Sequence, residues 1–157
     1  MTVKSIKLKS LIFYIVATFA FGLLGTLLGG NTSEVYKTFE RPPLSPPGIV
    51  FPIVWSILYL LLGVGAYILS TSKRVEVNKA LNIYWLQLLF NAIWPLIFWR
   101  FKAFYLAASI IVIMIILTVI LIVRSVKINK TAVYLFLPYT IWLLFALYLN
   151  LGIAILN

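Results

Sequence analysis

Unusual side chains interrupt the apolar run LQLLFNAIWPLIFW. Gln87 and Asn91 carry amides, and Pro95, beside Trp94, cannot donate a backbone hydrogen bond. At about 100° per residue, these positions and Phe98 share one stripe of a helix. An unpartnered amide costs free energy in lipid, so this stripe is predicted to face a neighbouring helix or a cavity.

Asn91 has the largest hydrogen-bonding capacity on this stripe. Its amide offers two donors and two acceptor lone pairs, and Pro95 also frees the backbone carbonyl of Asn91. The side chain is expected to bind the backbone of a neighbouring helix, Asn150 or a ligand carbonyl. A role in holding helices together and a role in binding ligand both remain open.

Two further apolar runs carry stripes with the same spacing. Each offers aromatic side chains with an occasional amide, so three helices are expected to turn similar faces inward. One stripe contains Phe51, Trp55 and Leu58 or Tyr59, and the other contains Pro138, Trp142, Phe145 or Ala146, and Leu149 or Asn150.

The composition excludes most catalytic chemistry. The chain contains no cysteine, histidine or aspartate, and its carboxylates are Glu34, Glu40 and Glu76, all in polar stretches. A Ser-His-Asp triad, a paired-carboxylate acid/base site, a thiolate metal site and a haem-ligating histidine are therefore not predicted. No metal and no cofactor is expected.

Apolar residues make up 64% of the 157-residue chain, well above the usage of soluble domains. An integral membrane protein is predicted, because charged residues divide the sequence into five runs long enough to span a bilayer. The length leaves room for a single domain over residues 1–157, an all-α bundle of five transmembrane helices. The first run is too long for the core of a signal peptide and is interpreted as a retained span. The runs cover about residues 8–30, 47–71, 79–99, 103–123 and 131–156.

Basic residues punctuate these runs instead of clustering, so the net charge of +10 indicates membrane topology and not a nucleic-acid partner. Cytoplasmic flanks carry the excess of Lys and Arg, which places the amino terminus in the cytoplasm and the carboxyl terminus outside. A lid at about residues 31–46, kept stiff and non-helical by its prolines, is then expected on the outer face. The cytoplasmic side would carry Lys4, Lys7, Lys9, Lys73, Arg74, Lys79, Arg124, Lys127 and Lys130, and the outer side Lys37, Arg41, Arg100 and Lys102.

Two interpretations of the inward stripes remain. Amides and small residues often hold transmembrane helices together, and tryptophans often form belts at the membrane interface. The belt account fits Trp85 and Trp99, which lie near the ends of their runs. Trp55, Trp94 and Trp142 lie beside prolines or amides, and a cavity walled by their indoles would suit a flat, apolar aromatic ligand.

The same residues carry a resemblance to a known family. Three motifs occur in order: P-P-G-x-x-F-P-x-V-W at 46–55, W-x-Q-L-x-x-N-x-x-W-P-x-x-F at 85–98, and P-Y-x-x-W-x-x-F-A-x-x-L-N at 138–150. They resemble the TspO family, also called tryptophan-rich sensory proteins, translocator proteins or peripheral-type benzodiazepine receptors. The similarity covers nearly the whole chain.

The resemblance implies a membrane receptor or sensor, commonly a homodimer and here in a bacterial cell membrane. It implies binding of porphyrins such as protoporphyrin IX, haem-like tetrapyrroles and isoquinoline-carboxamide ligands. Two other functions stay open: an enzyme that degrades protoporphyrin IX in light through Trp55 and Trp142, or a small porphyrin transporter. These two indoles are expected to face each other across one cavity under the lid. The implied ligand-binding residues are Tyr36, Phe51, Trp55, Tyr59, Asn91, Trp94, Trp142, Ala146 and Leu149.

Two other sequence features bear on partners. Tyr148 is followed by LNLGIAILN, which has no basic residue, so the sterol-recognition pattern of animal family members is incomplete and sterol binding is not inferred. Small residues also form rows that indicate either internal helix packing or a dimer interface. These rows are Gly22, Thr26 and Gly30; Gly25 and Gly29; and Ala103 and Ala107.

Overall fold

The computed structural model describes residues 7–157 and confirms the predicted all-α membrane fold with five spans. Lys4, which contributes to the predicted orientation, lies outside the described residues. A short helix, α2 (Thr32–Thr38), lies in the connection after the first span. The helices long and apolar enough to cross a membrane are α1 (Leu8–Gly29), α3 (Val50–Ser70), α4 (Val77–Pro95) continued by the π-helix η1 (Leu96–Arg100), α5 (Phe104–Val126) and α6 (Lys130–Leu156).

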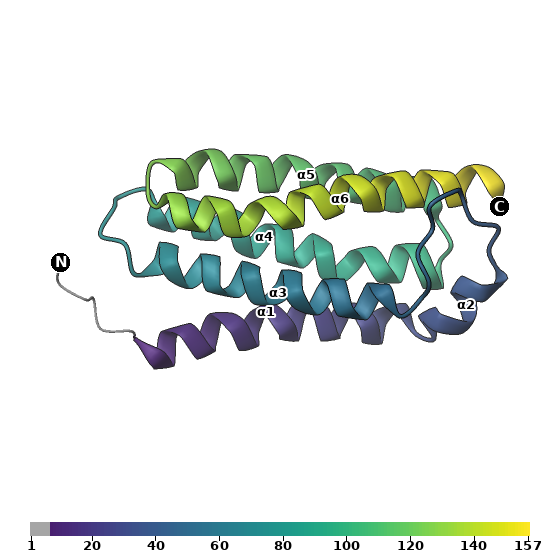
Figure 1. Cartoon of the computed structure of the whole chain (residues 1–157), viewed down its shortest axis with the longest axis horizontal. Coiled ribbons are helices and arrows are strands. Elements are labelled where there is room, and N and C mark those ends of the chain that lie inside the picture. Colours follow the sequence, from purple (N-terminus) through teal and green to yellow (C-terminus); the bar gives the residue numbers. More distant parts are fainter. Residues whose placement is uncertain (1–6) are drawn as a thin grey trace.

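The five long helices close into a ring. α1 packs against α3 and α4, α5 packs against α4 and α6, and α3 packs against α6. Figure 1 shows α2, the proline-rich segment and the carboxyl terminus together at one end of the bundle, here named the lid end. The α3–α4 and α5–α6 connections lie at the opposite end.

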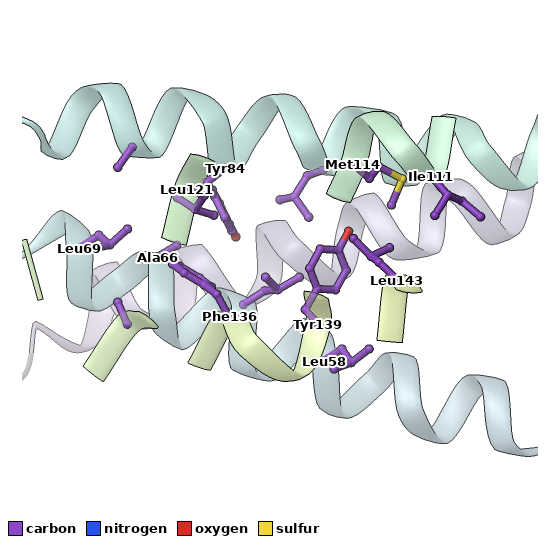
Figure 2. Close-up of a cluster of buried hydrophobic side chains, with 14 of the residues drawn as sticks. Leu58, Ala66, Leu69, Tyr84, Ile111, Met114, Leu121, Phe136, Tyr139 and Leu143 are labelled. Carbon is purple, nitrogen blue, oxygen red and sulfur yellow. The ribbon is translucent and has the colours of Figure 1, made fainter. Parts of the chain in front are cut away.

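A compact core fills the bundle from its middle to the opposite end (Figure 2). Phe136 and Tyr139 of α6 are fully buried between side chains of α3, α4 and α5. Gly65 leaves the space that the Phe136 ring occupies, and Gly63 lets the backbones of α3 and α1 approach closely. Because lipid is as apolar as these side chains, close packing rather than escape from water holds this region together.

The lid is only partly as predicted, because residues 32–38 are helical. The prolines begin at Pro42, too late to prevent a helix in the preceding segment. The Asn31 side chain accepts a hydrogen bond from the Glu34 N–H at 3.5 Å, and Lys37 pairs with Glu34 at 2.7 Å one turn away. Beyond this helix Phe39 is extended, and the chain is non-helical as far as α3, with turns at residues 43–44 and 48–49.

The glycine rows of α1 pack inside the bundle. A methyl group at Gly25 or Gly29 would lie 3.2 or 3.1 Å from the Pro95 ring, closer than ordinary van der Waals contact. Gly22 likewise lies against a side chain of α3, and Ala107 is fully buried. The interpretation as internal packing is therefore confirmed for Gly22, Gly25, Gly29 and Ala107, whereas Thr26 and Gly30 are exposed. A homodimer stays a prediction from the family resemblance.

Candidate functional site

The lid end encloses a cavity of about 760 Å³. Its wall is built from α1, α3, α4, η1 and α6, and the lid covers it, whereas α5 supplies none of its lining among the described residues. This volume is typical of sites that bury a small organic ligand. The structure brings all the predicted site residues into this one wall: Tyr36, Phe51, Trp55, Tyr59, Asn91, Trp94, Trp142, Ala146 and Leu149.

Aromatic rings of α3 and α6 form one continuous side of the cavity. Trp55 and Tyr59, one helical turn apart, have ring centroids at 5.3 Å, and Phe51 lies 6.2 Å from Trp142. Trp55 and Trp142 meet edge to face at 6.5 Å and 85°. The expectation that these two indoles face each other across the cavity is therefore wrong. They are neighbours in one wall, because α3 and α6 pack directly on each other.

The turn after Pro95 forms the adjoining wall. Proline cannot continue the hydrogen-bond ladder, and the next residues form the π-helix η1, in which the Phe101 N–H donates to the Leu96 carbonyl at 3.1 Å. Two consecutive side chains of η1, Phe98 and Trp99, both line the cavity.

Trp99 therefore lies in the cavity wall, although its sequence position suggested an interfacial belt. Its indole stacks on Phe39 of the lid at 6.0 Å with an interplanar angle of 5°, and it meets Tyr36 edge to face at 6.1 Å. Trp85, the other predicted belt residue, stacks on Tyr14 of α1 at 5.8 Å and does not line the cavity. A period of 3.6 residues, which underlies the sequence prediction, cannot place Trp99 correctly beyond a π-helix.

Asn91 links three helices through side chains. Its Oδ1 accepts a hydrogen bond from the Tyr59 hydroxyl at 2.8 Å, and its Nδ2 donates to the Tyr139 hydroxyl at 3.1 Å. Tyr139 in turn donates to Gln87 Oε1 at 2.7 Å. The described partners are thus tyrosines of α3 and α6, not the backbone or Asn150 as expected. Helical periodicity shows that Asn91 faces inward but not which helix stands opposite.

Asn150 holds a second cross-helix link. Its Oδ1 accepts a hydrogen bond from Trp94 Nε1 at 3.2 Å, and its Nδ2 donates to the Phe104 carbonyl at 2.8 Å. By contrast, the buried Trp142 Nε1 has no partner within residues 7–157. This nitrogen is buried within the wall, so it is an unsatisfied donor that the cavity does not expose.

The lid supplies the rim of the cavity. Tyr148 of α6, the residue of the incomplete sterol pattern, donates from its hydroxyl to the Pro43 carbonyl at 2.6 Å and so ties the lid to α6. Several lining residues were not predicted as site residues, although Phe98 and Asn150 lie on the predicted stripes. The unpredicted members include Thr26, Lys37, Arg41, Pro95, Phe98, Trp99, Asn150 and Ile153.

The carboxylates lie outside the cavity wall. Glu34 pairs with Lys37 on the lid, and Glu76 pairs with Lys79 at 3.3 Å and Arg124 at 3.0 Å at the opposite end. The described residues contain no group of three histidines, cysteines or acids that could hold a metal ion. The arrangement is suited to enclosing a flat aromatic molecule, and its indoles and phenols are side chains able to take part in electron transfer.

Comparison with known proteins agrees with this architecture. Residues 14–156 match the TspO/MBR family. The chain is 34% identical to the tryptophan-rich protein TspO of Chlorobaculum tepidum over 80% of each chain. It is 30% identical to the tryptophan-rich sensory protein of Cereibacter sphaeroides, over 85% of this chain and 82% of the relative. It is also 28% identical to the translocator protein of Ovis aries, over 82% of this chain and 79% of the relative. The chain is a multi-pass membrane protein and belongs to the TspO/MBR family.

Proposed function

We propose that this protein is a membrane receptor or sensor that binds a flat aromatic ligand of the porphyrin class in the lid-end cavity. The observation that carries the proposal is the concentration of aromatic rings from α3, η1, α6 and the lid around one volume of about 760 Å³. Stacked and edge-on rings suit the flat apolar faces of a macrocycle.

Intrinsic fluorescence provides the test, because Trp55, Trp94, Trp99 and Trp142 line the cavity and Trp85 does not. Protoporphyrin IX titrated into the protein in lipid nanodiscs should quench this emission and saturate at one equivalent. Trp85→Phe should leave the fractional quenching at saturation equal or slightly larger. Ala146→Phe, which places a ring in the cavity, should abolish saturation. Linear quenching that is the same in Ala146→Phe and the parent protein would rule out the proposal.

A second candidate, light-driven degradation of protoporphyrin IX, is favoured by the contact of Trp55 and Trp142 in the wall. An indole next to an excited porphyrin can donate an electron to it, and the reduced porphyrin passes that electron to dioxygen. The oxidised indole then takes an electron back from porphyrin, so porphyrin is oxidised, dioxygen is reduced and the indole is restored. Illumination should then consume more than one equivalent of porphyrin per protein. Trp55→Phe and Trp142→Phe should slow this reaction more than they weaken binding, whereas Trp85→Phe should change neither. Unchanged light-dependent kinetics in both cavity variants would leave the enzymatic alternative without residues to carry it.

The proposed orientation places the lid end outside the cell and the amino terminus in the cytoplasm, since the lid end has the smaller share of Lys and Arg. The chain has no cysteine, so a single introduced thiol reports its own location. In intact cells a membrane-impermeant maleimide should label Lys102→Cys and should not label Lys73→Cys until the cells are lysed. The reverse pattern would invert the topology.

A further inference from the structure

The rim of the cavity carries positive charge. Lys37 and Arg41 belong to its lining, and the described lining contains no carboxylate. The neighbouring rim residues, Thr32, Ser33 and Ser45, add hydroxyl groups without adding negative charge. An apolar cavity with a cationic rim suits a molecule that has an apolar body and an acidic edge.

The backbone at Arg41 is fixed on both sides. The Glu40 N–H donates to Asn157 Oδ1 at 3.0 Å, and Asn157 Nδ2 donates back to the Glu40 carbonyl at 2.9 Å. On the other side, the Pro42 ring packs on Gly152 of α6, where no room is left even for a methyl group. Arg41 therefore sits on a stretch anchored to α6 rather than on a freely moving loop.

The side chain of Arg41 is also positioned. Its guanidinium carbon lies 5.1 Å from the centroid of the Tyr36 ring, and the Tyr36 hydroxyl donates to the Pro46 carbonyl at 2.8 Å. Arg41 takes part in none of the salt bridges found over residues 7–157. Its planar donor fork thus remains available for a carboxylate, which it can bind through two parallel hydrogen bonds.

Lys37 is a weaker contributor at the same rim. It pairs with Glu34 at 2.7 Å, but the two side chains are 67% and 63% exposed. Exposed ion pairs of this kind contribute little free energy, so a ligand carboxylate can replace Glu34 at small cost.

The deep part of the cavity has the opposite character. Its polar members are all engaged in neutral hydrogen bonds: Asn91 with Tyr59 and Tyr139, and Asn150 with Trp94 and the Phe104 carbonyl. An ionised acid placed among them would lose its hydration without gaining a cation, which is strongly unfavourable. The charge distribution therefore fixes which edge of a ligand points inward.

We infer that the ligand is an amphipathic anion whose flat apolar body lies between the aromatic walls and whose carboxylate edge stays at the rim beside Arg41 and Lys37. This inference rests on the proposed function and adds the charge and the orientation of the ligand to it. A porphyrin with two propionates on one edge is a member of this class, and its dimethyl ester is the neutral analogue of the same shape.

These two molecules provide the test. Protoporphyrin IX and its dimethyl ester are titrated into the protein in nanodiscs of zwitterionic lipid, with tryptophan quenching as the readout. The diacid should bind about tenfold more tightly than the ester at low salt, and the ratio should shrink as salt is added. Arg41→Gln should weaken diacid binding about fivefold and Lys37→Gln less, while Glu34→Gln should strengthen it. None of the three should change ester affinity, which also shows that each variant is folded.

Arg100→Gln is the matched control, since Arg100 is an exposed cation at the lid end that does not line the cavity. Its diacid affinity should equal that of the parent protein. An equal loss in Arg100→Gln and Arg41→Gln would overturn the inference in favour of a general surface-charge effect. Equal affinities for diacid and ester, unaffected by Arg41→Gln, would overturn it while leaving the proposed function standing. Failure of both molecules to give saturable quenching would remove the proposed function, and this inference with it.

Discussion

The same helices form a filled core at one end of the bundle and a cavity at the other. Towards the end opposite the lid, Leu62 and Phe136 are fully buried, and glycines of α3 let neighbouring elements pack closely against it. Towards the lid end, Trp55 and Trp142 are only half buried, because a cavity lies beside them. The filled end closes because a glycine lies opposite the Phe136 ring and another lets two helices approach, whereas rings that meet one another in the wall at the lid end leave the volume beside them open.

The two ends also differ in where their cross-helix hydrogen bonds lie. At the lid end, the Asn91 and Asn150 amides tie α3, α4, α5 and α6 together at the cavity wall. At the opposite end, Thr18 of α1 bonds to Tyr84 of α4 inside a filled core. Cross-helix hydrogen bonds at the lid end therefore help to hold apart helices that would gain packing contacts by collapsing into the cavity.

The largest expected effect comes from Phe136→Ala at the filled end. The ring is fully buried against Gly65, so its removal leaves a void, and the free energy of unfolding should fall by about 3 kcal/mol. Phe51→Ala, beside the existing cavity, should cost much less stability but weaken porphyrin binding. Unfolding in mixed micelles measures the first quantity, and fluorescence titration the second. Equal stability losses at the two positions would erase the contrast between the ends.

Gly63→Ala should have the next largest effect. The added methyl would lie 2.8 Å from the Ile15 Cα, a backbone atom that cannot swing away, so α1 and α3 must separate at a cost of about 2 kcal/mol. Gly48→Ala in the lid is the control, because its methyl would lie 3.8 Å from the Tyr36 ring, an ordinary contact. The melting temperatures of both variants measure this effect. A Gly63→Ala protein as stable as Gly48→Ala would contradict the close approach of α1 and α3.

Asn91→Leu tests whether the lid end is braced by hydrogen bonds. The substitution leaves the Tyr59 hydroxyl without its acceptor and the Tyr139 hydroxyl without its donor, which should cost about 1 to 2 kcal/mol of stability. Asn82→Leu, at an exposed position of α4, should be close to neutral. Stability and porphyrin affinity measured on one preparation separate bracing from ligand contact, because bracing alone lowers the melting temperature and leaves the affinity of the folded protein unchanged.

Tyr148→Phe should give the smallest effect. It removes the hydrogen bond to Pro43 that ties the lid to α6, worth about 1 kcal/mol or less at an exposed site. Porphyrin dissociation, followed by stopped-flow fluorescence, should become faster while global stability hardly changes. Tyr105→Phe, whose hydroxyl makes no hydrogen bond within the described part of the chain, should leave the rate as it is. Identical dissociation rates in the two variants would show that this bond does not restrain the lid.

The membrane spans and their inward faces could be predicted from the sequence. Membrane spans are strongly apolar and bounded by charge, so the predicted run of about 8–30 closely matches α1 at Leu8–Gly29. Inward faces also follow from helical periodicity, which explains why Phe51, Trp55 and Tyr59 reach the cavity together. Local regularity is sufficient for both predictions.

The features that need information from other helices were not predictable. The partners of Asn91 depend on which helix packs opposite it. The helical turn at 32–38 is different, because Asn31 followed three residues later by Glu34 is a local signal for the start of a helix, which an expectation based on the prolines alone misses. Trp99 joins the wall because η1 changes the helical period, and no periodic pattern contains that change. Arg41 looks like one of several loop cations until the fold places it at the rim.

The π-helix η1 has a consequence for how this fold tolerates changes in length. A ladder of i to i+5 bonds holds one more residue per ring than the α-helical ladder that could replace it. Deleting one residue between Pro95 and Arg100 would allow the α-helical ladder to close while the turns on either side keep their orientation. The segment would then have one side chain fewer to present to the cavity that Phe98 and Trp99 now line together. A single insertion or deletion in this segment can therefore resize the cavity without substituting any residue of its wall.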